Sequence, residues 1–97
     1  MKSVFIAFEQ SLEERVLAIL SRRNIRGFTL WNGVLGTGTE TGDPHMNTHA
    51  WSQQNSAIMT MVEDEKVKPL LDSLEELDKK KPLLGIRAFV WTIEGGI

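Results

Sequence analysis

The fold is decided by residues 55–77, which read NSAIMTMVEDEKVKPLLDSLEEL. The first eight residues are rich in apolar and β-branched side chains, and they predict a strand over 55–62. Leucines then recur at helical spacing behind an acidic turn, which suits a helix N-terminus. Three lysines and a proline at 79–82 end this predicted helix. Pro69 is expected near its start, where a missing amide costs little.

A similar strand and helix come earlier in the chain. Residues 2–8 read KSVFIAF and predict a strand, while Ser11 and Glu14 have the spacing of a capping box that opens a helix. The apolar side of this predicted helix consists of Leu12, Val16, Ile19 and Leu20. Two further strands are predicted over 28–35 and 85–93.

The resulting order, βαββαβ, predicts an α+β fold of the ferredoxin-like sandwich type over residues 1–97, taken as a single domain. We expect an antiparallel four-stranded sheet with two helices on one face. The first and last strands carry apolar residues on both sides, with Phe5 opposed to Val4 and Phe89 opposed to Val90. A solvated sheet face would alternate to polar residues, so we expect the face without helices to pack against other copies of the chain.

Composition excludes several classes of function. The 97 residues include no cysteine, so disulfides, thiolate nucleophiles and cysteine-ligated zinc are excluded, and a cytoplasmic location is expected. The chain contains eleven Lys and Arg and thirteen Asp and Glu, and this slight excess of negative charge argues against nucleic acid as a partner. No apolar run approaches the roughly 18 residues that span a bilayer. The sequence also lacks an ordered catalytic triad or nucleophile elbow, so we expect no enzyme.

Residues 36–54 form a long segment without helical or strand periodicity. Loops beyond about 12–15 residues in a compact domain are usually functional or disordered. Gly36 and Gly38 could cradle an anion through backbone amides, or they could simply form a turn that needs positive φ. Trp51 could stack on a ligand or anchor a partner, or it could fold the loop back onto the domain.

The same segment contains both histidines of the chain, His45 and His49. Asp43 and Glu40 lie close by in the sequence, and imidazole together with carboxylate could hold a divalent metal. The alternative is a solvated loop in which the spacing of the two histidines has no meaning, since it places them on one face only in a helix.

Three stretches resemble the nitrogen-regulatory PII superfamily of trimeric ferredoxin-like signalling proteins. They are Gly27-Phe28-Thr29, the glycine-rich GTGTETG at 36–42, and residues 58–74 with the pattern Asp-Glu-x-Val-x-Pro. The resemblance implies a homotrimer with ligand clefts between subunits, and it makes residues 36–54 similar to the family's T-loop, which reaches partner proteins. It also implies the ligand-binding residues Thr29, Gly36, Gly38, Glu40 and Arg87.

The chain departs from this family in ways that affect its chemistry. It contains no tyrosine, so the nucleotidylation known in the family is excluded. The family's phosphate-cradling Gly-Asp-Gly-Lys is replaced by Leu-Gly-Ile-Arg at 84–87, which leaves Arg87 as the one cation there. Glu40 stands where the family has a glutamine. We therefore do not expect ATP with 2-oxoglutarate to bind as in typical members.

The leading hypothesis is a non-enzymatic trimeric regulator that binds a small effector and acts on a partner through its loop. The cofactor is expected to be an adenine nucleotide or a divalent metal, and the partner a membrane transporter or its cytoplasmic domain. Met46 and Trp51 are the expected partner contacts. The alternative is a divalent or heavy-metal-binding protein of the same fold that uses His45, His49 and Asp43.

Overall fold

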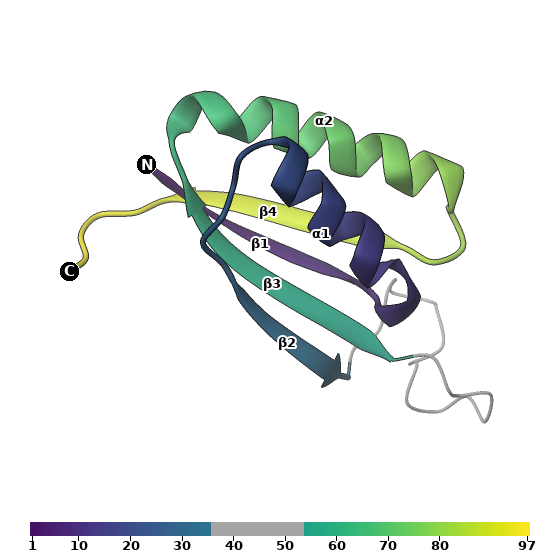
Figure 1. Ribbon diagram of the computed structural model, residues 1–97. Helices are drawn as coiled ribbons and strands as arrows, with labels where there is room; N and C mark the ends of the chain where they lie inside the picture. The colour runs from purple at the N-terminus through teal and green to yellow at the C-terminus, as the bar shows by residue number, and fades with distance from the viewer. Residues whose placement is uncertain (36–53) are drawn as a thin grey trace.

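The computed structural model describes residues 1–35 and 54–97 (Figure 1). In chain order its elements are β1 (Lys2–Glu9), the 3-10 helix η1 (Gln10–Leu12), α1 (Glu13–Arg22), β2 (Thr29–Val34), β3 (Asn55–Val62), α2 (Asp64–Lys80) and β4 (Ile86–Thr92). The strands form one sheet in the order β2-β3-β1-β4, and every neighbouring pair is antiparallel. Both helices cover the same face of this sheet (Figure 1). The predicted ferredoxin-like fold is confirmed.

The strands lie close to where the sequence pattern placed them. β3 has the predicted bounds, β1 is one residue longer, and β2 and β4 are each one residue shorter at both ends. The register is fixed by apolar alternation, because a slip of one residue would move every core side chain to the other face. Ile6 of β1 lies opposite Ile58 of β3 and Ala88 of β4, which places these three side chains together under the helices.

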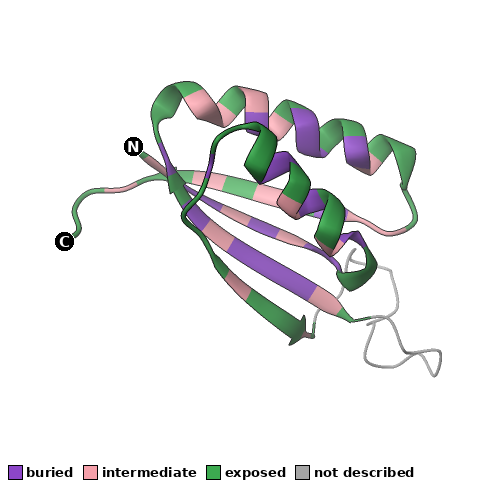
Figure 2. Cartoon of the chain, in the orientation of Figure 1, coloured by how far each residue is buried: buried purple, intermediate pink, exposed green. Residues whose placement is uncertain are grey.

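The core lies between the helices and the sheet. Buried positions follow one stripe of each helix and most of the two central strands, β1 and β3 (Figure 2). Burying a side chain of this size contributes about 1.5–3 kcal/mol. The core includes Val4, Ile6, Phe8, Leu12, Val16, Ile19, Leu20, Ile58, Leu70, Leu74 and Leu77. The helical members of this core are the apolar stripes that the helical spacing predicted.

The predicted capping box at the start of α1 is wrong. The chain first forms η1, and α1 begins at Glu13 with Leu12 in the N-cap position and no side-chain cap. The Ser11 hydroxyl instead donates a hydrogen bond to the carboxylate of Glu9. The Ser11 oxygen would have accepted a hydrogen bond from an amide of the first helical turn, but the strong bond from its hydroxyl to a charged carboxylate directs the side chain toward Glu9 instead.

Pro69 lies deeper in α2 than predicted. The helix begins at Asp64, so Pro69 is its sixth residue and cannot donate a hydrogen bond to the carbonyl of Glu65. The packing of Leu70 and Leu74 beside it holds the helix in place, since both side chains are fully buried. Within the described residues, no helix has the length and apolar character needed to cross a membrane.

Candidate ligand-binding surface

One face of the sheet has no helix over it, and we call it the open face. Its side chains alternate along each strand with those of the core, and the register brings Phe5 of β1 between Met59 of β3 and Phe89 of β4. Phe89 is 59% exposed and Trp91 is 46% exposed, which is unusual for large apolar side chains. The open face consists of Ser3, Phe5, Ala7, Thr29, Trp31, Ala57, Met59, Met61, Arg87, Phe89 and Trp91.

Thr29 and Arg87, the two predicted ligand residues that the structure describes, both belong to the open face. Thr29 pairs with Met59 and stands on the edge strand β2, whereas Arg87 pairs with Ala7 and stands on the opposite edge strand β4. Strands β3 and β1 lie between them, a width of roughly 14 Å at the usual strand spacing. A ligand touching both residues within one chain would have to lie across two strands and their apolar side chains.

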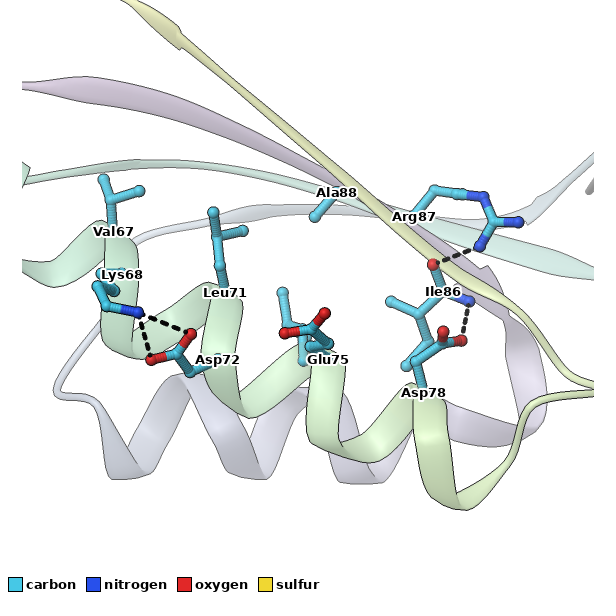
Figure 3. Close-up of a pocket in the computed structure, with 10 residues that line it drawn as sticks. Val67, Lys68, Leu71, Asp72, Glu75, Asp78, Ile86, Arg87 and Ala88 are labelled. Carbon is cyan, nitrogen blue, oxygen red and sulfur yellow. Dashed lines mark hydrogen bonds and ion pairs between the residues drawn. The ribbon is translucent and has the colours of Figure 1, made fainter.

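Arg87 is exposed and partly fixed by its own backbone. Its Nη1 donates a hydrogen bond of 2.9 Å to the carbonyl oxygen of Ile86. Figure 3 shows the guanidinium pointing away from the carboxylates of α2. A guanidinium has five N–H donors, so this single contact leaves donors available to a phosphate or carboxylate. The residue can therefore bind an anion at the β4 edge.

A groove of about 570 Å³ lies on the helical side of the same strand, between α2 and β4 (Figure 3). Its apolar floor consists of Val67, Leu71, Leu74, Ile86 and Ala88. On the rim, Lys68 Nζ lies 3.1 Å from Asp72 Oδ2, and Glu75 and Asp78 add two further carboxylates. This local charge opposes binding of a phosphate. Arg87 also lines this groove, but the three carboxylates there outnumber the two cations, Lys68 and Arg87. The groove is therefore a poor phosphate site, and Arg87 is better placed to bind an anion on the open face, where the strand register puts it.

A polar cluster fixes the end of the sheet at which β1 ends and β3 begins. The Ser56 hydroxyl donates to Glu13 Oε1 at 3.1 Å, and the Gln10 amide donates to the Gln54 carbonyl at 2.7 Å. Glu9 is buried here beside Ser11. The sequence analysis missed this cluster, because strand alternation does not show which polar side chains at a strand end will be buried together.

Ser3 is a second residue that the sequence analysis missed. It lies on the open face between Met61 and Trp91, and its buried hydroxyl has no hydrogen-bond partner within residues 1–35 and 54–97. Leaving a buried hydroxyl unpaired costs about 1–3 kcal/mol. The hydrogen-bonding capacity of this part of the open face is thus not satisfied within the described residues of a single chain.

The remaining predicted site residues lie outside the described residues. They are Gly36, Gly38, Glu40, Asp43, His45, Met46, His49 and Trp51. In the part of the chain that the structure describes, no group of three or more His, Cys, Asp or Glu side chains could hold a metal ion. A metal site that uses the two histidines therefore stays a prediction.

Several solved structures have the same fold as this chain. CPII from Thiomonas intermedia K12, bound to ADP, AMP and acetate, superposes with a TM-score of 0.76 at 22% identity, covering 99% of this chain and 88% of CPII. CPII bound to ADP and bicarbonate gives 0.74 at 23% identity, covering 95% and 84% of the two chains. A PII-like signaling protein from Thermus thermophilus gives 0.67 at 25% identity, covering 95% and 85%.

Comparison with curated proteins gives no match. The family Nitrogen regulatory protein P-II, in contrast, matches residues 1–95, which is nearly the whole chain and includes every helix and strand described above. The resemblance inferred from the sequence motifs is confirmed by this match and by the fold. The chain belongs to the nitrogen regulatory protein P-II family.

Proposed function

We propose that this chain is a non-enzymatic regulator that forms a homotrimer and binds a small anionic effector in the clefts between its subunits. In each cleft, Arg87 on β4 of one copy faces Thr29 on β2 of the next. Residues 36–53 then act on a partner, a membrane transporter or its cytoplasmic domain, from a cytoplasmic location.

The observation that carries this proposal is the position of Thr29 and Arg87 at opposite edges of the open face. One chain keeps them apart, but a head-to-tail ring brings the β2 edge of each copy to the β4 edge of its neighbour. The exposed aromatic side chains of Phe89 and Trp91 supply the apolar area that such an assembly needs. The site is therefore incomplete until copies associate.

The effector class is inferred from the relatives and from the charge of the site. CPII has been solved bound to ADP, AMP and acetate and to ADP and bicarbonate. In this chain the β4 edge of the cleft offers a single described cation, Arg87, so we propose an adenine nucleotide with a short phosphate chain in preference to ATP. A guanidinium pairs in bidentate fashion with one phosphate or carboxylate group.

Mixing two defective variants tests the shared cleft. Arg87→Gln removes the cation from one edge, and Thr29→Glu places a like charge beside the anion on the other edge. Each variant alone should bind AMP or ADP at least about tenfold more weakly in calorimetry. After denaturation, mixing and refolding together, roughly one cleft in four combines two intact edges, and wild-type affinity should return in that fraction.

Each result of this experiment has a definite meaning. If the mixed sample binds no better than its components, Thr29 and Arg87 do not share a cleft and the proposal fails. Restoration of tight sites, together with a mass three times that of the 10.9 kDa chain in light scattering, supports the proposal. Arg15 offers a control, because Arg15→Gln removes an exposed cation of α1, which covers the other face of the sheet, and should leave nucleotide affinity unchanged.

A further inference from the structure

The connection between α2 and β4 is a tight turn with an apolar residue at its tip. The Leu84 amide donates a hydrogen bond of 3.0 Å to the Lys81 carbonyl, so Pro82 and Leu83 occupy the two central positions. Proline at the first central position fits a turn, but the second normally carries a polar residue or glycine. Leu83 is 97% exposed, whereas its neighbour Leu84 packs against the core. The fold therefore does not account for Leu83.

Three lysines precede this turn directly. Lys79, Lys80 and Lys81 are all exposed, and within the described residues none of them forms an ion pair. The negative end of the α2 dipole accounts for some positive charge here, but that effect is confined to the last helical turn and does not require an adjacent exposed leucine. Cations beside an exposed apolar side chain are typical of segments that lie in the interface of an anionic membrane.

The position of the turn in the fold is also suitable. The register places the start of β4 beside the end of β1, and the end of β1 beside the start of β3, so these termini share one end of the sheet. Figure 1 shows the α2–β4 connection at this end, where β2 also stops. Leu35, which follows β2, is 63% exposed there. The turn therefore lies at the same end of the sheet as Leu35 and Gln54.

We propose that this lysine-leucine turn, residues 79–84, docks on an anionic lipid bilayer. Leu83 enters the headgroup region, and the three lysines contact anionic headgroups. A single copy suffices for the contact, but its affinity is low. The trimer of the proposed function would place three such turns at the same height along its axis and raise the affinity through multivalency.

Vesicle co-sedimentation tests the proposal on the full chain. Vesicles of phosphatidylcholine with phosphatidylglycerol should bind the protein, pure phosphatidylcholine vesicles should not, and binding should fall as salt is raised. The double variant K79Q/K80Q should lower the bound fraction about fivefold or more. The control R22Q/R26Q removes the same charge at the end of α1, remote from the turn, and should bind like wild type. Leu83→Ser keeps the charge and should also weaken binding.

A fluorescent probe gives a second readout that does not depend on affinity. The chain has no cysteine, so Leu83→Cys and, as a control, Glu65→Cys on the first turn of α2 each give one labelling site for an environment-sensitive fluorophore. Anionic vesicles should shift the emission of the label at 83 to shorter wavelength and leave the label at 65 unchanged. Circular dichroism confirms that each variant is folded.

Several outcomes would overturn the proposal. Equal loss of binding in R22Q/R26Q would indicate nonspecific charge attraction. An identical emission shift with inorganic phosphate alone would indicate a small-anion site. A label at 83 that stays unchanged with vesicles but shifts when the protein is concentrated would mean that another protein surface covers Leu83. Any of these results excludes docking of this turn on lipid.

Discussion

The Asp78 carboxylate on α2 accepts a hydrogen bond from the Ile86 amide at the start of β4, with 3.0 Å between Oδ1 and N. This amide points away from β1, toward the unpaired edge of the sheet. The carboxylate thus satisfies a donor that no strand reaches and ties the end of α2 to the edge strand. Because Ile86 is part of the core, this contact also holds the base of the turn that precedes it.

Removing this carboxylate should destabilise the fold. We expect Asp78→Ala to lower the free energy of unfolding by about 1–3 kcal/mol, because the partly buried amide loses its acceptor. Asp78→Asn keeps an oxygen acceptor and should retain most of the stability. Urea denaturation measures both. Asp72→Asn is the control, since its exposed ion pair with Lys68 is worth less than about 1 kcal/mol. Equal losses at 78 and 72 would contradict the assignment.

Gly33 is required by the irregular end of β2. Its φ of +67° is unfavourable for other residues, and an added Cβ would lie 3.0 Å from Gln54 Oε1. Gly33→Ala should therefore cost about 1–2 kcal/mol from the backbone alone, with the contact adding to it. Gly85 has a φ of +76° but open space around it, so Gly85→Ala isolates the backbone term. Thermal unfolding that ranks Gly85→Ala as the more damaging change would disagree with this reasoning.

The open face should be necessary for assembly but not for folding of the single chain. Phe89→Asp puts a charge among the exposed aromatic side chains of this face, so we expect a smaller species in light scattering with unchanged helical circular dichroism. Leu83→Asp introduces the same charge at another exposed apolar residue and should leave the assembly intact. A trimer that persists in Phe89→Asp would show that the subunits associate through a different surface.

Asp64 should titrate at unusually low pH in the 97-residue chain. The N-terminal ammonium of Met1, 2.8 Å from Asp64 Oδ1, lowers the pKa of this carboxyl through a hydrogen bond and through its charge. The stability from this pair should therefore be complete above the unfolded pKa of about 3.9 and be lost as the pH falls through the lower folded value. NMR titration of the carboxyl carbon measures the shift, and acetylation of the N-terminus should remove most of it, leaving the smaller effect of the Lys2 charge.

The histidine pair remains the testable basis of the metal hypothesis. If His45 and His49 bind zinc or copper, affinity should fall as the pH drops below about 6.5, since the metal must displace protons from the imidazoles. His45→Ala and His49→Ala should each weaken binding measured by calorimetry. Asn32→Ala, a substitution of an exposed residue without metal-ligating character, is a suitable control. Unchanged binding in both histidine variants would exclude this site.

The elements of the fold could be predicted because their signals are local. The content of apolar and β-branched residues predicted the strand over 55–62, and the spacing of Leu70, Leu74 and Leu77 predicted the buried side of α2. The start of α1 could not be predicted in this way. The Ser11 oxygen could have accepted a hydrogen bond from a helix amide, and only the folded chain shows that its hydroxyl instead donates to the carboxylate of Glu9.

The residues of the candidate site could be predicted from the sequence, but their arrangement in the folded chain could not. Sequence motifs selected Thr29 and Arg87, yet their separation across the sheet follows from the strand order, which no local pattern contains. The burial of Ser3 could not be predicted for the same reason, because its neighbours Met61 and Trp91 belong to two other strands. Long-range pairing therefore decides which of the selected residues can act together.

If the proposed trimer forms through the open face, stability should depend on concentration. A sheet that is apolar on both sides buries one side within the chain and would then bury the second against other copies, so part of the folding free energy would become available only on association. The midpoint of thermal unfolding should then rise as the protein is concentrated. A diluted or newly made chain, by contrast, would expose a row of aromatic side chains and depend on rapid encounter with its own kind to avoid aggregation.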